Sequence, residues 1–232
     1  MAKFLKRWMW RLLLLSLCAA PLYLVWILLH LVYWNTFNPR TTAFMQSRLE
    51  ILREHSPNAA LRHQWVDYEH ISPHLKRAVI ASEDSQFMKH NGFDFQAIQT
   101  AFEKNIKQGK LVAGGSTISQ QLAKNLFLSD KKTIWRKFDE ALITIMLENT
   151  MSKRRILEIY LNLIEWGHDI FGAEAAARHY FGVSASALTD KQAAFLASIV
   201  PNPRYFDRNR KAPKLLKKSD IILSRMPLSK IP

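Results

Sequence analysis

The chain has one cysteine, Cys18, among its 232 residues, which excludes an intramolecular disulfide bond. It has only 7 glycines, too few for a turn-rich all-β fold. Acidic residues are also scarce, since Lys and Arg outnumber Asp and Glu by 33 to 19, a net charge of +14. Such an excess favours an anionic partner, which would be a nucleic acid, a phosphorylated substrate or an anionic membrane surface.

The N-terminal part of the chain has no acidic residue before Glu50, and residues 12–34 have no charged residue of either sign. A helix of about 20 such residues crosses the hydrocarbon core of a bilayer. Four cations precede it, namely Lys3, Lys6, Arg7 and Arg11. The positive-inside rule therefore predicts a cytoplasmic tail (residues 1–11), a transmembrane anchor (residues 12–34) and export of the remainder.

A cleaved signal peptide is the alternative to an anchor, with Cys18-Ala19-Ala20 as its cleavage site. The apolar run continues for 14 residues beyond Ala20, which is too long for that interpretation. The four N-terminal cations stay on the inner side, so the exported part keeps +10 of the +14. That charge faces away from cytoplasmic nucleic acid, and we expect no nucleic-acid partner.

The exported part is predicted to be mostly helical. Residues 35–71 are interpreted as a juxtamembrane connector with a short helix at residues 41–55, and residues 72–232 as the main exported domain. Helix caps are predicted at Ser72, Asp94, Thr117 with Gln120, and Thr189 with Gln192. Apolar stripes of helical period are Ile98, Ala101, Phe102 and Ile106; Ile118, Leu122 and Leu126; Ile134, Phe138, Leu142 and Ile145; and Ile156, Tyr160 and Leu163. No segment shows the sustained period-two alternation of a sheet.

Glu83 is placed where an apolar helix stops. The helix predicted from Pro73 to about Ser82 would bury Leu75, Ala78 and Val79, so Glu83 falls at its C-terminal end. A carboxylate there is partly desolvated and faces the negative end of the helix dipole, which suits a general acid or base. A solvated helix terminus bearing two acids is the alternative.

The stretch Gly114-Gly115-Ser116-Thr117 precedes another predicted helix, whose N-terminal N–H groups favour a phosphate. It is not a Walker loop, because no Gly-Lys-Ser/Thr follows the glycines. Further along, Arg136 and Lys137 lie four and three residues before Glu140, so the three side chains can share a helical face. A surface ion pair is the ordinary explanation, but five cations lie within 14 residues: Lys124, Lys131, Lys132, Arg136 and Lys137.

His70 and His74 have a spacing that could hold zinc, but other ligands of the right kind are not evident nearby. Ordinary surface histidines are the preferred interpretation, and the identity of any metal ligand stays open.

Five ordered blocks resemble the glycosyltransferase domain of bacterial peptidoglycan polymerases, a family that includes domains of bifunctional penicillin-binding proteins and monofunctional enzymes. The blocks are E-D-x-x-F-x-x-H-x-G at residues 83–92, G-G-S-T-I-S-Q-Q with K-N at residues 114–125, R-K-x-x-E at residues 136–140, K-x-x-I-L-E-x-Y-L-N at residues 153–162, and A-A-x-x-Y-F-G at residues 176–182. The resemblance covers residues 79–203 and leaves no room afterwards for a transpeptidase domain. It implies a lysozyme-like helical fold of the monofunctional kind.

The resemblance also implies the chemistry. Glu83 would be the general base that deprotonates the C4 hydroxyl of acceptor lipid II, and attack at C1 of the growing glycan would release undecaprenyl diphosphate with inversion. Glu140, the second acid, would act with Lys124, Arg136 and Lys137 on the diphosphate. Lys132 belongs to the same cationic group and stands where some relatives have arginine, which alone can grip a phosphate through two parallel bonds. Ser116, Gln120 and Gln121 would line the glycan cleft, Asn125 would join the substrate-binding residues, and Glu158, Tyr160 and Asn162 would support the cleft wall.

No cofactor is required by these residues, although a divalent ion (Mg²⁺ or Mn²⁺) could assist at the diphosphate. The partners implied are lipid II, the growing glycan strand, the cytoplasmic (inner) membrane, and cell-wall synthesis or division proteins. Two alternatives remain open: a lysozyme-like hydrolase, which also uses two carboxylates, and a non-catalytic scaffold that holds anionic lipid through its positive charge.

Overall fold

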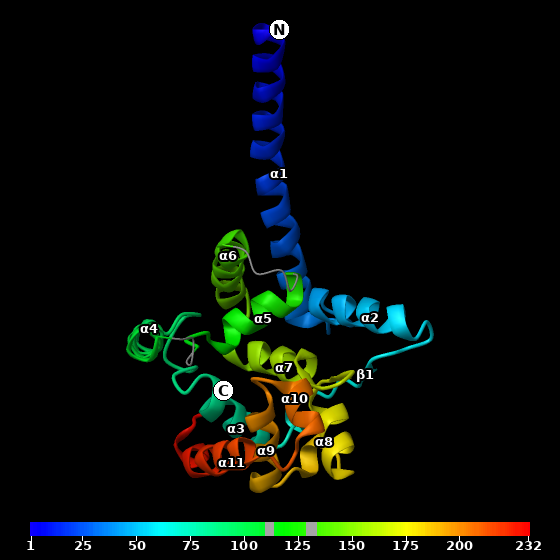
Figure 1. Ribbon diagram of the computed structural model, residues 1–232, viewed down its shortest axis with the longest axis vertical. Coiled ribbons are helices and arrows are strands. Elements are labelled where there is room, and N and C mark those ends of the chain that lie inside the picture. Colours follow the sequence, from blue (N-terminus) through cyan, green and yellow to red (C-terminus); the bar gives the residue numbers. More distant parts are fainter. Residues whose placement is uncertain (110–113, 129–133) are drawn as a thin grey trace. The chain divides into compact units, whose positions relative to one another are not determined.

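The computed structural model describes residues 1–109, 114–128 and 134–232, and the chain is mostly helical, as predicted (Figure 1). It divides into two compact units, Met1–Asn38 and Pro39–Pro232. Lys131 and Lys132, which belong to the predicted cationic group, lie outside the described residues.

The first unit is dominated by α1 (Ala2–Thr36), which contains Pro21. Its helical conformation at residues 12–34 is confirmed. The ring of Tyr33 stacks on that of Phe37, the residue that follows the last turn of α1, with 4.6 Å between centroids. Within the described part of the chain, no helix combines the length and the apolarity that a membrane crossing requires.

The second unit is built mainly from short helices. Its α-helices are α2 (Ala43–His55), α3 (Pro73–Glu83), α4 (Phe95–Gln108), α5 (Ile118–Phe127), α6 (Ile134–Thr150), α7 (Lys153–Leu163), α8 (Ala173–Phe181), α9 (Asp190–Ile199), α10 (Pro203–Arg208) and α11 (Pro213–Arg225). Among the described residues, the 3₁₀ helices are η1 (Tyr68–His70), η2 (Ala185–Ala187) and η3 (Met226–Leu228). The capping boxes predicted at Thr117 and Thr189 are both present.

Two helical groups form the core of this unit. In one, α3, α9 and α11 pack against each other; in the other, α5 contacts α2, α6 and α7 (Figure 1). Fully buried aromatic side chains fill the interior, among them Trp166, Tyr160, Phe87 and Phe171. Because α3 belongs to the first group and α5 to the second, residues at their ends can meet where the two groups adjoin.

A small sheet completes the unit, with strands β1 (Arg62–His63), β2 (Glu165–Gly167) and β3 (Ile170–Phe171) in the order β1-β3-β2. Strand β1 runs parallel to β3 in register Arg62 with Ile170, and β2 runs antiparallel to β3. Strands of two and three residues are too short to produce a period-two pattern, which is why the sequence did not predict them. Of the segment interpreted as a connector, residues 35–71, the part from residue 39 onward belongs to this compact unit, because α2 packs on α5 and β1 pairs with β3.

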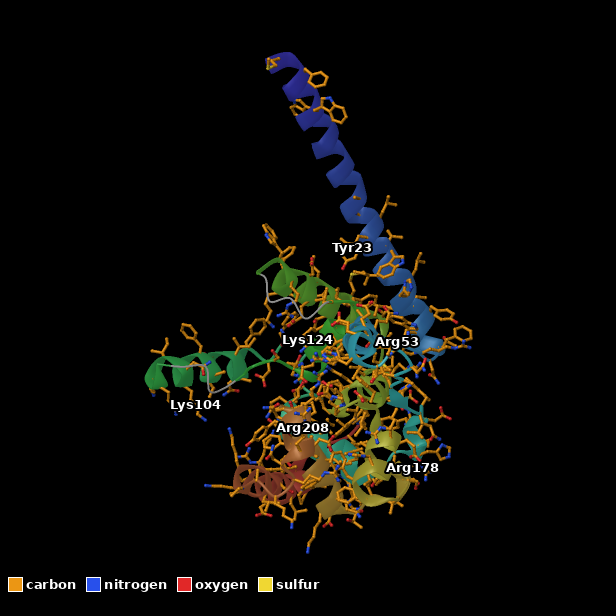
Figure 2. The ribbon with its side chains drawn as sticks, turned by 45° about the vertical axis from the view of Figure 1, so that its right-hand side comes forward. Tyr23, Arg53, Lys104, Lys124, Arg178 and Arg208 are labelled. Carbon is orange, nitrogen blue, oxygen red and sulfur yellow. The ribbon has the colours of Figure 1, made fainter. Side chains whose placement is uncertain are left out.

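Two predicted apolar stripes do not face the core. On α4, Phe102 is 64% exposed, Ile98 and Ile106 are also exposed, and only Ala101 is buried. On α6, Phe138 is 60% exposed and Ile145 is exposed, while Glu140, Ile143, Thr144 and Leu147 are buried. Figures 1 and 2 both show α4, which carries Lys104, at the edge of the unit. Helical periodicity predicts that a helix has an apolar face, but neighbouring elements decide whether that face is covered.

Candidate active site

Glu83 is the last residue of α3, as predicted from the end of the apolar run. Ser72 caps the start of this helix by accepting the His74 N–H, and Leu75, Ala78 and Val79 are buried as expected. The helix thereby delivers the Glu83 carboxylate to the edge of the core, where its side chain keeps 11% exposure.

Three groups hold the Glu83 carboxylate. Ser82 Oγ donates to Oε1 at 2.7 Å, and Gln121 Nε2 of α5 donates to Oε2 at 3.3 Å. Lys218 Nζ of α11 forms an ion pair with Oε1 at 3.5 Å. Each of these interactions stabilises the charged form of a carboxylate.

Tyr160 of α7 orients Gln121. Its hydroxyl donates to Gln121 Oε1 at 2.8 Å, which leaves the amide Nε2 directed at Glu83. Burial raises the pKa of the Tyr160 phenol well above its usual range, and the charges of Glu83 and Asp84 act in the same direction. The phenol therefore keeps its proton and remains a donor throughout the physiological range.

Asp84 fastens α3 to the start of α5. Its side chain is 1% exposed, and its carboxylate accepts from His90 Nε2 at 2.8 Å and from the Ile118 backbone N–H at 3.0 Å. The Gly92 N–H donates to His90 Nδ1 at 3.1 Å, so Nε2 is the ring nitrogen that carries the proton toward Asp84.

The N-terminus of α5 does not offer the free N–H groups that the sequence predicted. The Thr117 N–H donates to Gln120 Oε1, the Ile118 N–H to Asp84, and the Gln120 N–H to Thr117 Oγ1. The prediction of a phosphate at this terminus is therefore wrong for these three amides: the Asp84 carboxylate takes the favourable position of the anion. Gln120 is itself buried in the capping box.

Gly92 connects these segments at a close approach. Its φ is +92°, and a Cβ added there would lie 2.7 Å from Thr144 Cγ2 and 3.1 Å from Glu148 Cγ. Its carbonyl accepts from Thr117 Oγ1 at 2.6 Å. Both the left-handed backbone and the absence of a side chain are therefore needed for α5 and α6 to lie against this turn.

Gly92→Ala should lower the free energy of unfolding by about 2–4 kcal/mol, because backbone strain and overpacking add. Gly182→Ala is the matched control, since its φ is +69° but nothing lies within 4 Å of an added Cβ. Denaturant unfolding of the two variants separates the contributions. Equal losses would contradict the importance of the contact with Thr144.

A cavity of about 890 Å³ opens beside Glu83. It is lined from α3 and the segment after it, from the start of α4, from the residues before α5, and from the end of α11 and the segment that follows: Ala81, Ser82, Glu83, Asp84, Ser85, Gln86, Met88, Lys89, Asp94, Ala97, Gly114, Gly115, Ser116, Thr117, Arg225, Leu228, Ser229 and Lys230. The structure thus brings Ser116, which is exposed, to the same cavity as Glu83.

Glu140 does not line this cavity. It is 3% exposed on α6 and forms ion pairs with Arg136 NH1, at 3.2 Å, and with Lys137 Nζ. The predicted pairing at three and four residues is confirmed, and the burial of Glu140 shows that it is not an ordinary surface pair. Lys137 keeps its side chain 54% exposed, so one of the two cations faces solvent. Lys124 of α5 is half-buried and also lies outside the cavity lining.

Three further predicted residues make contacts within the fold. The Asn162 side chain exchanges hydrogen bonds with the backbone of Val66 at 2.9 Å. Glu158 accepts from the Tyr68 N–H at 2.8 Å and pairs with Arg155. Asn125 is buried on α5. These contacts hold the segment before η1 against α7, the helix that carries Tyr160.

The chain matches the family model described as "Transglycosylase" over residues 50–227. A protein of Nitrosomonas eutropha named biosynthetic peptidoglycan transglycosylase is 64% identical over 225 residues, covering 97% of this chain and 92% of that protein. Proteins of the same name from Nitrosospira multiformis (62% identical; 99% and 100% covered) and Nitrosomonas europaea (65% identical; 99% and 94% covered) are similarly close.

The chain belongs to the transglycosylase family. The resemblance read from the five sequence blocks is thereby confirmed, and the protein is a glycosyltransferase.

In this transglycosylase, the structure adds residues that the sequence did not assign to the site. Asp84 and His90 lie within the first sequence block, so the motif already contained a signal for them. Lys218, Arg225 and Lys230 lie beyond residue 203, where no block was recognised, and only the return of α11 and η3 to α3 brings them to Glu83 (Figure 1). The one signal in the sequence for these residues is Lys218 itself, a lysine that lies between apolar residues on one face of an amphipathic helix.

The residues around Glu140 do not make a protein-built metal site. Among the described residues, no group of three or more His, Cys, Asp or Glu side chains is arranged to hold a metal ion. Both oxygens of Glu140 already face cations.

Proposed function

We propose that this transglycosylase polymerises lipid II into glycan strands, with inversion at C1 of the MurNAc sugar and release of undecaprenyl diphosphate. The observation that carries this proposal is the position of Glu83. Its carboxylate is largely shielded from solvent, is held by three partners, and lies on a cavity large enough for sugar units.

Glu83 is the general base of this reaction. It takes the proton from the C4 hydroxyl of the acceptor sugar while that oxygen forms a bond to C1 of the growing strand. The bond from C1 to the diphosphate oxygen breaks on the opposite face and its electron pair leaves with the diphosphate, so the configuration inverts. Ser116 and Gln121 lie close enough to this centre to contact the sugars, while Gln120, Glu158, Tyr160 and Asn162 support the site through the contacts described above.

Arg136, Lys137 and Lys124 neutralise the diphosphate. Glu140 pairs with the first two and holds their side chains on one face of α6, which restricts their freedom before substrate arrives. Lys132 belongs to the same group by sequence. Since the charge of a diphosphate is shared among several cations, no single one is expected to be indispensable.

The fold of residues 72–232 is of the lysozyme-like kind in this proposal, and a hydrolase that cleaves the same polymer is the closest rival. A hydrolase also uses paired carboxylates, but it has no need of a cationic group for a diphosphate. Incubation of the full chain with labelled lipid II, followed by separation of polymer from monomer, tests the function. Growth of polymer supports it; shortening of added glycan without growth would replace it with hydrolysis; binding without either product would indicate a scaffold.

The cellular location follows from the same proposal. Lipid II carries a long lipid tail, so an enzyme of the cell envelope that uses it works at a membrane surface. Residues 1–11 would be a cytoplasmic tail and residues 12–34 a single anchor in the cytoplasmic (inner) membrane. The catalytic part would lie on the periplasmic side, where it could contact cell-wall synthesis or division proteins.

We expect the intact chain to require detergent for extraction, because residues 12–34 carry no charged side chain. Protease added to sealed spheroplasts should digest the part after residue 34, and addition of detergent should not be needed for that cleavage. A chain extracted by salt alone would contradict the anchor, and protection of the C-terminal part would contradict its orientation.

A further inference from the structure

Lys218 occupies an unusual position on α11. Leu215 and Ile222 are buried on this helix, and position 218 follows the first by three residues and precedes the second by four, which places it on the same inward face. An apolar side chain would ordinarily stand there. Lys218 instead directs its ammonium group at Glu83 Oε1, 3.5 Å away, with the side chain only one-third exposed.

The positive charge of Lys218 is compensated by the negative charge of Glu83. Burial lowers the pKa of the Lys218 ammonium, while the charge of Glu83 and its hydrogen bond act in the opposite direction and Lys214 adds a smaller lowering effect. A lysine on a core-facing stripe carries a desolvation cost, and the ion pair with Glu83 offsets it. The contact is thus specific to this pair of side chains.

The charged and polar groups that face Glu83 come from several elements. Asp84 follows it but is bound to His90 and the start of α5. From α5 and α7 come the neutral Gln121 and Tyr160, and from α9 only the Ala197 carbonyl, which accepts from Ser82. The other charged groups lining the cavity are Lys89, Asp94, Arg225 and Lys230. Among the described residues, Lys218 is the cation that forms an ion pair with Glu83.

A cationic partner favours the carboxylate over the carboxylic acid. A general base must be deprotonated when substrate arrives, whereas the general acid of a glycoside hydrolase must carry a proton. The pair with Lys218 therefore suits Glu83 to the role of general base.

We propose that Lys218 is a positioning residue for the transfer reaction, which keeps Glu83 ionised and fixes the direction of its carboxylate. This inference rests on the proposed function of Glu83 as general base. Lys218 does not accept the substrate proton: the proton moves from the C4 hydroxyl to Glu83.

The test is the pH dependence of lipid II polymerisation by the full detergent-solubilised chain. Lys218→Met keeps the length of the side chain and removes its charge, so the acidic limb of kcat should move to higher pH by about one unit, a loss of about tenfold on that limb. The KM for lipid II should be unchanged, since Lys218 acts through Glu83. Lys218→Arg should restore the wild-type limb, because the guanidinium keeps the positive charge.

Lys217→Met is the matched control, since Lys217 is exposed on the same helix. Its pH profile should superimpose on that of the wild type. If the pH profile of Lys218→Met also superimposes on that of the wild type, Lys218 has no role in the protonation state of Glu83. The same conclusion follows if the KM of this variant rises while the acidic limb of kcat does not move. Thermal unfolding of each variant establishes that the comparison is made between folded proteins.

A second measurement separates this inference from the proposed function. In protein labelled with ¹³C at glutamate, the resonance of Glu83 is identified as the one that disappears in Glu83→Gln. The pH titration of this resonance should move to higher pH in Lys218→Met. If the wild type makes no polymer at any pH, the proposed function fails, and the titration alone decides the influence of Lys218. An unmoved titration overturns the inference even when polymerisation is normal.

Discussion

Replacing Glu83 with Gln should lower lipid II polymerisation by at least about 100-fold, the lower end of what general base catalysis contributes. The amide keeps the size of the side chain and one acceptor oxygen, so Ser82 can still donate to it. It cannot take a proton, and the acceptor hydroxyl stays a poor nucleophile. Lipid II binding should survive, because the proposed diphosphate contacts are made by other residues. The rate of polymer formation and the Kd for lipid II measure the two effects separately.

The controls for this variant follow from the surroundings of Glu83. Glu54→Gln makes the same chemical change at an exposed position on α2 and should leave the rate unaltered. Asp84→Asn tests the neighbouring acid, whose carboxylate is buried and joins His90 to the start of α5. Its loss should appear mainly as a lower Tm. The assignment of the base is wrong if Glu83→Gln polymerises near the wild-type rate, or if Asp84→Asn is the slower enzyme while both variants are equally stable.

Removal of a cation from the proposed diphosphate group should have the second largest effect. Arg136→Ala and Lys124→Ala should each cost about 1.5–3 kcal/mol, the range for hydrogen bonds to charged groups. That corresponds to about 10- to 150-fold in kcat/KM for lipid II. Steady-state kinetics with the full chain provides the measurement.

Arg136→Ala has a further consequence that Lys124→Ala lacks. This variant loses one of the two ion pairs of the buried Glu140 and keeps the pair with Lys137. Because a buried charge is destabilising when it loses a partner, Arg136→Ala should also reduce stability. Arg136→Lys keeps the charge and should recover part of the activity but not all, since lysine cannot form two parallel bonds to a phosphate. Lys211→Ala, at an exposed position between α10 and α11, is the control for loss of a single charge. Wild-type kinetics in both alanine variants would remove the cationic group from the mechanism.

Local sequence determined the helices and their limits. Ser72, Asp94, Thr117 and Thr189 each accept the N–H that a cap requires, and α3 ends at Glu83 where the apolar run stops. These features depend on residues within one or two turns of each other, so they can be read without knowledge of the fold. The pairing of Glu140 with Arg136 and Lys137 belongs to the same category, because positions three and four apart meet on any helix.

Other predictions failed because they depended on distant neighbours. The stripes on α4 and α6 are amphipathic as expected, yet Phe102 and Phe138 are exposed since no described element covers them. The start of α5 resembled a phosphate site in isolation. However, the Ile118 N–H donates a hydrogen bond to Asp84, which lies thirty-four positions earlier in the chain. No local pattern could reveal that an acid of one helix would neutralise the dipole of another.

The sequence alone therefore determined the family, the helical class of the fold and the residue proposed as base, because each is encoded in short blocks whose spacing is preserved in any conformation. The tertiary structure decided what surrounds that base. Lys218 is 135 positions from Glu83 along the chain, and Gln121 and Tyr160 come from two further helices. These side chains meet only because α3 packs on α9 and α11 and because the end of α3 adjoins α5 and α7. The charge and direction of a carboxylate depend on groups within a few ångströms in space, and chain folding, not sequence proximity, selects those groups.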